Sequence, residues 1–427
     1  MIDRIIEFSL KQRLLVIAMT LLIAALGIYS LNDIPIDALP DVTNIQVQVI
    51  AEAPGLSPVE TERLVTSPIE IAMNGLPQLT EVRSISKFGL AVVTVVFEDG
   101  VDIYFARQLV LERLQSASES LPPSVPQPAM GPITTGMGEI YQYFLESDSL
   151  DLIDLRTVQD WIVKPQLRTV PGVTEVNSFG GLVKQYQVLV DPQKLLSYDL
   201  SLEDVFEAVE KNNSVVGGGY LEHASEQYIV RGIGLVQNEH DLEDIIVKSE
   251  QGSPVYLRNV AKIAIGPEAR QGAVVMQGRG EVSAAIVMML KGENSQKVIE
   301  RVKAKVEEIN KTLPRHVKIH PYYDQTDLVS KTIATVRTNL MEGGLLVLAI
   351  LLIFLGDMRA GFIVALTIPL SMLFAFIGME WLGLAANLMS LGAIDFGMIV
   401  DGSVVMVENF VRNLTHKDPE RTTTQII

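Results

Sequence analysis

The chain has 427 residues, of which 48% are hydrophobic and 20% are charged, and its mean hydropathy is +0.29. This composition is too apolar for an ordinary soluble protein and too charged for a fully buried one, so it predicts a membrane part joined to a soluble part. The net charge of −17 without a basic run argues against nucleic-acid binding, and the lack of cysteine excludes disulfides and thiolate metal sites.

Four apolar segments are candidates for membrane spans, which need about 20 residues as helices. They are residues 14–31, 338–356, 360–379 and 382–411. The first segment lacks a small-x-small cleavage motif, so we interpret it as a retained anchor and not as a signal peptide. The second reaches full length only if it extends back through Glu342.

Basic residues flank these segments on alternating sides. They are Lys11, Arg13, Arg359, Arg412, Lys417 and Arg421. Because basic flanks tend to remain in the cytoplasm, the long segment 32–337 is predicted to lie outside it, and residues 412–427 inside.

The first part of the long segment, about 40–125, has the pattern of one α+β cassette. An alternating strand at 44–53 is followed by a helix at 57–74, for which Ser57 and Glu60 form a capping box. Strands at 81–86 and 91–97 and a helix at 102–118 complete the order strand–helix–strand–strand–helix, a split βαβ layout. A proline-rich bridge at 122–128 ends the cassette.

A second cassette is predicted at about 130–180 and 271–330, interrupted by an inserted subdomain at about 181–270. Its expected elements are helices at 152–169 and 295–313 and strands at 175–179, 283–290 and 317–322. The insertion has a strand at 185–190, a helix at 202–211 and an exposed turn at Gly217, Gly218 and Gly219. The predicted fold class is therefore a membrane protein with α-helical transmembrane spans and an α+β extracytoplasmic domain of split βαβ (ferredoxin-like) subdomains.

Three carboxylates, Asp395, Asp401 and Glu408, interrupt the fourth apolar segment. An ionisable side chain within a span is costly, so it indicates a functional site by default. At about 100° per residue, Asp401 and Glu408 share one helix face and Asp395 lies about 120° away. Titrating carboxylates suit a proton-coupled machine, although Glu408 could instead contact lipid headgroups. Glu342 is either an interfacial carboxylate or an accessory proton site.

Metal-ligand signals are weak. No His-x-His motif or closely spaced Asp/Glu cluster is present, and we predict no cofactor. Met130, Met137, Met288 and Met289 are interpreted as core filler. The glycines at 217–219 lack the Lys-Ser/Thr of a phosphate-binding loop, so the energy source is expected to be an ion gradient.

Several motifs resemble the resistance–nodulation–division (RND) exporters across the whole chain. They are IPIDALPDV at 34–42, PGLSPVETERLVTSPIE at 54–70, VPGVTEVNSFGGLVKQYQVLVDP at 170–192 and DFGMIVDGSVVMVEN at 395–409. The motif GPITTGMGEIYQY at 131–143 is typical of the heavy-metal efflux branch. Asp-Phe-Gly before Val-Asp-Gly is similar to its cobalt–zinc–cadmium type.

The resemblance implies a secondary transporter, not an enzyme. It would exchange protons for divalent heavy-metal cations (Co/Zn/Cd/Ni-like) in the bacterial inner membrane, as a multi-pass protein with a large periplasmic loop. Its partners would be a periplasmic adaptor and an outer-membrane channel, and the complete protein would be a homotrimer in the lipid bilayer.

The resemblance also assigns parts and residues. Residues 1–13 would be a cytoplasmic amphipathic helix, 32–337 a porter loop and 181–270 a docking subdomain. Asp395, Asp401, Glu408 and Glu342 would form the proton relay. Glu139 would contact substrate, because the corresponding region borders the substrate cleft.

Two departures keep alternatives open. Drug-exporting members carry two adjacent aspartates where this chain has Asp401 and Gly402, which argues against a hydrophobe or drug exporter. Family members are about twice as long, so the chain would be an N-terminal portion, and a truncated transport-inactive fragment is a further alternative. An intramembrane aspartyl protease needs aspartates on two facing helices, whereas these share one.

Overall fold

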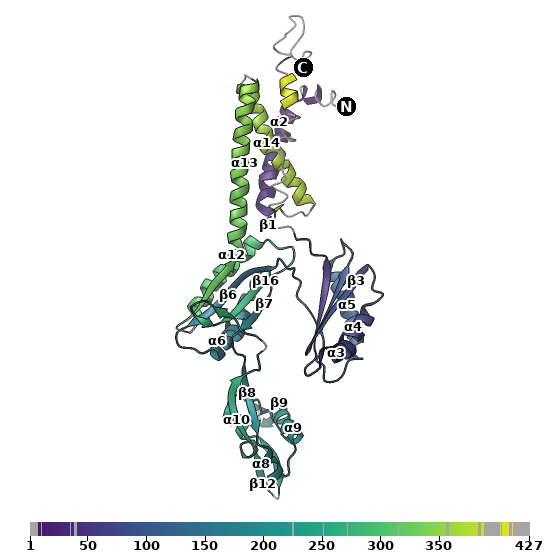
Figure 1. The fold of residues 1–427 in the computed structure, drawn as a ribbon, viewed down its shortest axis with the longest axis vertical. Helices are drawn as coiled ribbons and strands as arrows, with labels where there is room; N and C mark the ends of the chain where they lie inside the picture. The colour runs from purple at the N-terminus through teal and green to yellow at the C-terminus, as the bar shows by residue number, and fades with distance from the viewer. Residues whose placement is uncertain are drawn as a thin grey trace.

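A computed structural model describes most of the chain. The described residues are 7–9, 11–34, 36–37, 41–223, 226–250, 252–270, 272–314, 316–355, 358–382, 386–387, 402, 404–409 and 412. Long helices lie at one end, two sheet-containing units lie beside each other next to them, and a third unit lies at the far end (Figure 1). We call these the first unit (residues 41–130), the second unit (139–180 and 283–324) and the inserted unit (184–267).

The first unit is a four-stranded sheet with helices on one face. The strand order is β3-β4-β2-β5, with antiparallel pairing throughout. Its elements are β2 (Ile45–Glu52), α3 (Pro58–Thr61), α4 (Ser67–Met73), β3 (Leu79–Lys87), β4 (Leu90–Phe97), α5 (Ile103–Ser118) and β5 (Ala129–Met130). Alternate residues of β2, namely Val47, Val49 and Ala51, are buried in a core with Ile69 and Val110 from the helices, as expected for a strand with one covered face.

The second unit repeats this arrangement around the insertion. Its strand order, β17-β6-β16-β7, places the last strand beside the first and the third beside the second, as in the first unit. Its elements are β6 (Glu139–Ser147), α6 (Leu152–Val158), α7 (Lys164–Leu167), β7 (Val173–Gly180), β16 (Ser283–Met289), α12 (Ser295–Thr312) and β17 (Val317–Asp324). Tyr143, Val287 and Ile299 are among the residues of its separate core.

The first helix of each unit contains one wide π turn. These turns are η1 (Glu62–Thr66) and η2 (Gln159–Val163), and each lies just before a proline, Pro68 or Pro165. Proline lacks an N–H and clashes with the carbonyl four residues earlier in a regular α-helix. A π turn absorbs this mismatch, so the predicted helices 57–74 and 152–169 continue past their prolines.

The inserted unit leaves and re-enters the second unit through paired strands. β8 (Lys184–Val190) and β13 (Ala261–Pro267) are antiparallel neighbours. The unit has its own core, which includes Val205, Leu257 and Val260. Its other elements include α8 (Pro192–Ser197), α9 (Leu202–Asn212), α10 (Glu239–Glu243), β11 (Ile246–Glu250), β12 (Ser253–Tyr256) and α11 (Leu257–Val260).

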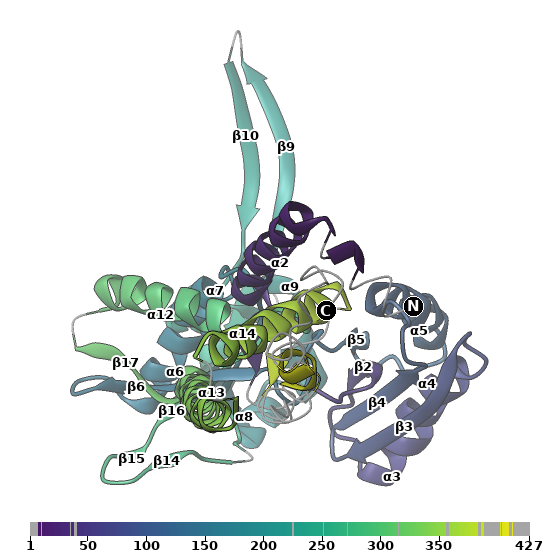
Figure 2. The ribbon, with the colours of Figure 1, turned by 90° about the horizontal axis from the view of Figure 1, so that it is seen from above.

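The predicted turn at Gly217–Gly219 is wrong, because these glycines lie inside a strand. β9 (Val215–His223) and β10 (Glu226–Ile233) form a hairpin in which Gly217 pairs with Arg231. The register shifts between Ile229 and Arg231, and Gly219 has a φ of +82°, so glycine here permits a bulge. The hairpin projects far from the rest of the molecule (Figure 2).

Three long helices form the opposite end: α2 (Arg13–Asp33), α13 (Gln325–Leu355) and α14 (Met358–Trp381). Among the residues that the structure describes, two segments are long and apolar enough to cross a membrane, Arg13–Leu31 and Gly361–Trp381. α13 begins directly after β17, so the predicted second span, 338–356, corresponds to the later part of a longer helix. Most of the predicted fourth span lies outside the described residues.

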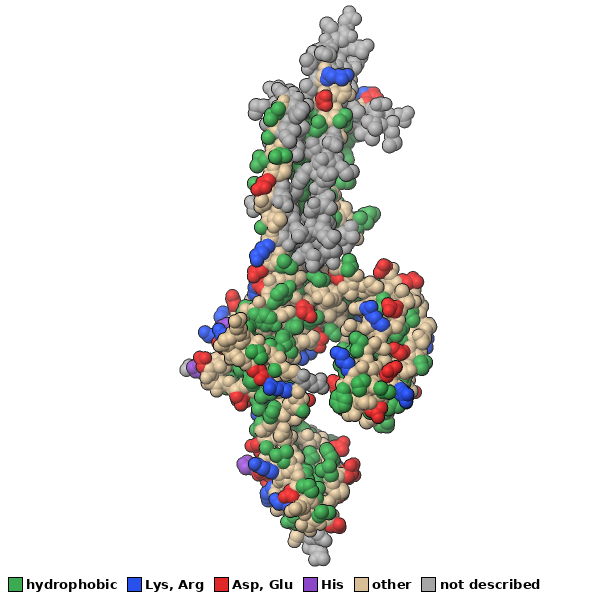
Figure 3. Space-filling view, in the orientation of Figure 1, with side chains coloured by type: hydrophobic (Ala, Val, Ile, Leu, Met, Phe, Trp, Pro, Cys, Tyr) green, Lys and Arg blue, Asp and Glu red, His purple; other side chains and the backbone are tan. Residues whose placement is uncertain are grey.

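The ends of two of these helices meet beside the sheet units. β1 (Ile36–Asp37), which follows α2, pairs in parallel with β18 (Ala386–Asn387), which follows α14. Charged side chains are dense over the sheet units and sparse over the described part of the helices (Figure 3).

Candidate functional site

Two of the four acids predicted to form the proton relay, Glu408 and Glu342, lie within the described residues. Asp395 and Asp401 lie outside the described residues, so their roles remain predictions. Glu408 is exposed within the described helical residues 404–409, and Glu342 is exposed in the middle of α13. Their predicted place in a proton relay likewise remains a prediction.

Glu139 is the first residue of β6 and belongs to a row of three side chains across the second sheet. Met288 of β16 pairs with Glu139 on one side and with Glu175 of β7 on the other. Side chains of directly paired residues lie on the same face, with Cβ atoms about 5 Å apart. The sheet therefore places a thioether between two carboxylates, and we call these residues the Glu139–Met288–Glu175 row.

The row lies on the sheet face opposite the helices. Val287 and Met289, the neighbours of Met288, are buried in the core on the helix side, whereas Met288 is half-buried and Glu139 is exposed. Gln142 lies close by and donates a hydrogen bond from Nε2 to Glu139 Oε2 at 3.2 Å. This end of the face is therefore accessible and carries carboxylate, thioether and amide groups.

A short hairpin covers another part of the same face. β14 (Val275–Met276) and β15 (Gly280–Glu281) pack over Phe144, Val282 and Ala284. Glu146 holds the hairpin through an ion pair with Arg279, and it also contacts Nε2 of His320 on β17 at 2.7 Å. The uncovered part of the face thus has a defined boundary.

The electrostatics around the row favour cations. Burial and the negative charge of Glu139 raise the pKa of the Tyr322 phenol, which shows that the Glu139 charge acts across to β17. The row carries two carboxyl side chains and can contact a cation without enclosing it. In the part of the chain that the structure describes, no group of three or more His, Asp or Glu residues could hold a metal ion.

Two of the other candidate methionines, Met289 and Met130, lie in or against the hydrophobic cores. Met289 is 8% exposed and belongs to the core of the second unit, and Met130 packs against the core of the first. The prediction of core filler is therefore confirmed for these two residues. It is wrong for Met288, which points away from the core.

Sequence reasoning missed Glu175 and Met288 as neighbours of Glu139. β16 follows β7 only after the inserted unit, so their register could not be inferred from proximity in the chain. The available signal was the predicted strand at 283–290. Successive side chains of a strand point to opposite faces, so Met288 and Val287 had to lie on opposite faces of the sheet.

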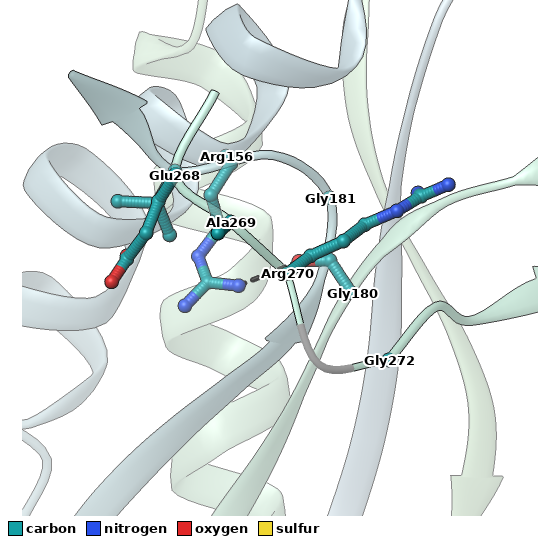
Figure 4. Close-up of a pocket in the computed structure, with 8 residues that line it drawn as sticks. Arg156, Gly180, Gly181, Glu268, Ala269, Arg270 and Gly272 are labelled. Atoms are coloured by element: carbon teal, nitrogen blue, oxygen red, sulfur yellow. Dashed lines mark hydrogen bonds between the residues drawn. The ribbon is translucent and has the colours of Figure 1, made fainter. Parts of the chain in front are cut away.

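A pocket of about 250 Å³ lies where the inserted unit joins the second unit. Figure 4 shows that its two arginines, Arg156 and Arg270, point in different directions. Arg156 donates from Nη1 to the Gly180 carbonyl at 2.5 Å and from Nε to Asp160 at 2.7 Å, and Arg270 pairs with Glu281. Both arginines thus have structural partners.

The profile of the AcrB/AcrD/AcrF family matches residues 5–426. The chain belongs to this family of RND transporters. It is 52% identical to cation efflux system protein CzcA of Alcaligenes sp. (strain CT14), over 97% of this chain and 40% of that protein. It is 41% identical to cation efflux system protein CusA of Escherichia coli (strain K12), over 99% of this chain and 41% of CusA.

A solved structure agrees with this membership. The X-ray crystal structure of a heavy metal efflux pump (crystal form II) matches with a TM-score of 0.88 and 39% identity, over 99% of this chain and 42% of that one. This RND chain therefore spans about two fifths of the length of the relatives that it matches, as their N-terminal portion. The family resemblance inferred from the sequence is confirmed.

Proposed function

We propose that this chain is the N-terminal portion of a proton-driven inner-membrane exporter of divalent heavy-metal cations. The observation that carries the proposal is 52% identity, over 97% of the chain, to the cobalt-zinc-cadmium resistance protein CzcA of Cupriavidus metallidurans (strain ATCC 43123 / DSM 2839 / NBRC 102507 / CH34). The nickel and cobalt resistance protein CnrA of the same strain is 41% identical. Zinc, one of the cations in these names, accepts carboxylate ligands, which the Glu139–Met288–Glu175 row supplies.

In this proposal, residues 32–337 form a periplasmic porter loop between spans at 14–31 and 338–356, and further spans follow at 360–379 and 382–411. The first and second units are its two split βαβ subdomains. The β1–β18 pair supports this topology, because it requires α2 and α14 to end on the same side. Tyr29 and Trp381 are exposed near these ends, as expected for aromatic residues at a membrane interface.

The inserted unit is proposed to dock neighbouring copies in a homotrimer. Its β9–β10 hairpin exposes apolar side chains along its length, including Tyr220, Leu221, Tyr228 and Ile229. Such a surface is unfavourable in water and marks an interaction site. A periplasmic adaptor and an outer-membrane channel would complete the export route.

The transport cycle would couple Asp401 to the sheet units. Protonation of Asp401 would change the packing of its helix against its neighbours, because the charge that must be kept hydrated or paired disappears. α13 follows β17 without an intervening residue, so a movement of this helix would be transmitted to the sheet that carries the row. Asp395, Glu408 and Glu342 would assist in proton transfer, and Glu139 would contact the cation.

The test is growth of a metal-sensitive bacterial host on graded zinc, cobalt and cadmium. The complete exporter should raise tolerance, and residues 1–427 alone should not. Asp401→Asn keeps the size of the side chain but cannot titrate, so in the complete exporter it should abolish the tolerance while its membrane level and trimer remain unchanged. Glu139→Gln should cause a partial loss, and Glu112→Gln, on the exposed side of α5, serves as the matched control.

Three outcomes would contradict the proposal. Tolerance to hydrophobic drugs without tolerance to metals would indicate a drug exporter. Full tolerance with Asp401→Asn would exclude proton coupling through this residue. Tolerance from residues 1–427 alone would show that the remaining part of the relatives is not needed.

A further inference from the structure

The motif at residues 131–138, GPITTGMG, is the crossing from the first unit to the second. At its start, the Gly131 amide donates to the Gln48 carbonyl of β2 at 2.7 Å. At its end, the Gly138 carbonyl accepts from the amide of Met289 of β16, also at 2.7 Å. A Cβ on Gly138 would lie 3.1 Å from the Thr135 carbonyl oxygen and 3.2 Å from the Met289 carbonyl oxygen, so glycine suits this close attachment.

A second segment, Thr43 and Asn44, enters the first unit from the side of β1 and leads into β2. Lys291, in the turn after β16, contacts both segments. Its amide donates to the Ile133 carbonyl at 3.1 Å, and its Nζ donates to the carbonyls of Thr43 at 3.1 Å and Asn44 at 3.5 Å. One half-buried residue of the second unit therefore contacts both the crossing between the units and the segment that enters the first unit.

The first unit holds the same crossing from its own side. Arg107 of α5 donates from Nη1 to the Gly131 carbonyl at 2.7 Å. Burial lowers the pKa of Arg107, but a guanidinium remains charged in proteins. The motif is thus contacted from each unit, at its start by the Arg107 guanidinium and at Ile133 by the Lys291 backbone amide.

These contacts matter because the two units have separate hydrophobic cores. Units with separate cores that are joined by extended segments move relative to each other unless contacts between them prevent it. A charged donor bonded to backbone carbonyls is among the stronger of such contacts. Lys291 is well placed to fix the angle between the units without contributing to either core.

We propose that Lys291 is a positioning residue between the first and second units, and that it sets how far these units open in the exporter. The part that concerns export rests on the proposed function; the part that concerns the angle between the units does not. Loss of the Nζ contacts should allow the units to separate more widely, while each unit keeps its own hydrophobic core.

The experiment measures the distance between the units by pulsed electron spin resonance. Spin labels are placed at Gln115→Cys on α5 and Lys311→Cys on α12, both exposed, in the complete exporter without other cysteines. Lys291→Met keeps the length of the side chain and removes the donor. It should shift the ratio of the population at the open distance to the population at the closed distance by about tenfold, the size expected for one charged hydrogen bond.

Two comparisons separate positioning from folding. Lys291→Arg retains a charged donor and should restore the wild-type distances, and Lys262→Met, on an exposed position of β13, should leave them unchanged. In metal transport, Lys291→Met should lower the maximal rate and leave the apparent affinity for zinc unaltered. Unchanged distances with Lys291→Met would contradict the positioning role of Lys291, whether or not the wild-type protein exports metal. Changed distances with no export by the wild type would instead refute the proposed function alone.

Discussion

Asp324 is the residue at which the second sheet passes into α13. It ends β17, and its Oδ1 accepts the Thr326 amide at 2.9 Å, which satisfies a free N–H at the start of the helix. It also pairs with Lys303 of α12. Burial alone would raise the pKa of Asp324, but the hydrogen bonds from Lys303 and Thr326 outweigh it and hold the pKa below its ordinary value of 3.8.

This lowered pKa predicts an acid-sensitive contribution to stability. The folded state binds fewer protons at Asp324 than the unfolded state, so the contribution is complete above about pH 3.8 and disappears as the pH falls through the lower folded value. Asp324→Asn should therefore lower the free energy of unfolding by about 1 kcal/mol at pH 7. Thermal unfolding in detergent should show the same difference from wild type at pH 7 and pH 5 and a smaller difference at pH 3.

A double-mutant cycle provides the control for Asp324. Lys303→Met should be destabilising at pH 7, and Lys303→Met combined with Asp324→Asn should be less destabilising than the sum of the two. Additive effects would show that the ion pair contributes nothing to the junction.

At the scale of elements, α2 and α14 are held together by close approach. A Cβ on Gly27 of α2 would lie 2.5 Å from the Cβ of Leu373 and 2.7 Å from its carbonyl oxygen. Ile34 and Phe376 pack together at the end of the pair near β1. Small residues allow such backbone contact between membrane helices, so the packing depends on the absence of a side chain at position 27.

Gly27→Ala should therefore destabilise the helix pair by about 1–3 kcal/mol, because one methyl group has no space there. Gly378→Ala on α14 is the matched control, since nothing lies within 4 Å of its Cβ position and alanine favours a helix. The melting temperature in detergent should therefore be lower for Gly27→Ala than for Gly378→Ala. Equal melting temperatures would mean that α2 and α14 do not pack through Gly27.

At the scale of the whole molecule, the predicted topology places all three sheet-containing units on one side of the membrane. α2 leads into the first unit, and α13 returns from the second. Basic residues lie at the other ends of these helices, with Arg13 as the first residue of α2 and Arg359 shortly after the end of α13. The inserted unit should therefore be periplasmic, and the turn between α13 and α14 cytoplasmic.

Reporter fusions test this topology. A reporter that is active only outside the cytoplasm should be active after Gly252, in the β11–β12 turn, and silent after Arg359. A cytoplasmic reporter at the same two positions should give the opposite result. Activity of the same reporter at both positions would contradict the proposed orientation.

The sequence by itself determined the elements whose signals are local. The capping box at Ser57 and Glu60 is present with both hydrogen bonds, because its partners are three residues apart. The alternation at 44–53 corresponds to β2, since one face of that strand is buried. The family could also be inferred from the sequence, because its motifs are contiguous.

Only the tertiary structure decided which distant residues meet. The Glu139–Met288–Glu175 row depends on the register of three strands, two of which are separated by the inserted unit. The glycines at 217–219 have the composition of a turn, yet pairing with β10 holds them in a strand. Lys291 lies 248 residues from Thr43. No local pattern encodes such contacts, because strand pairing and the packing of units arise only when the whole chain folds.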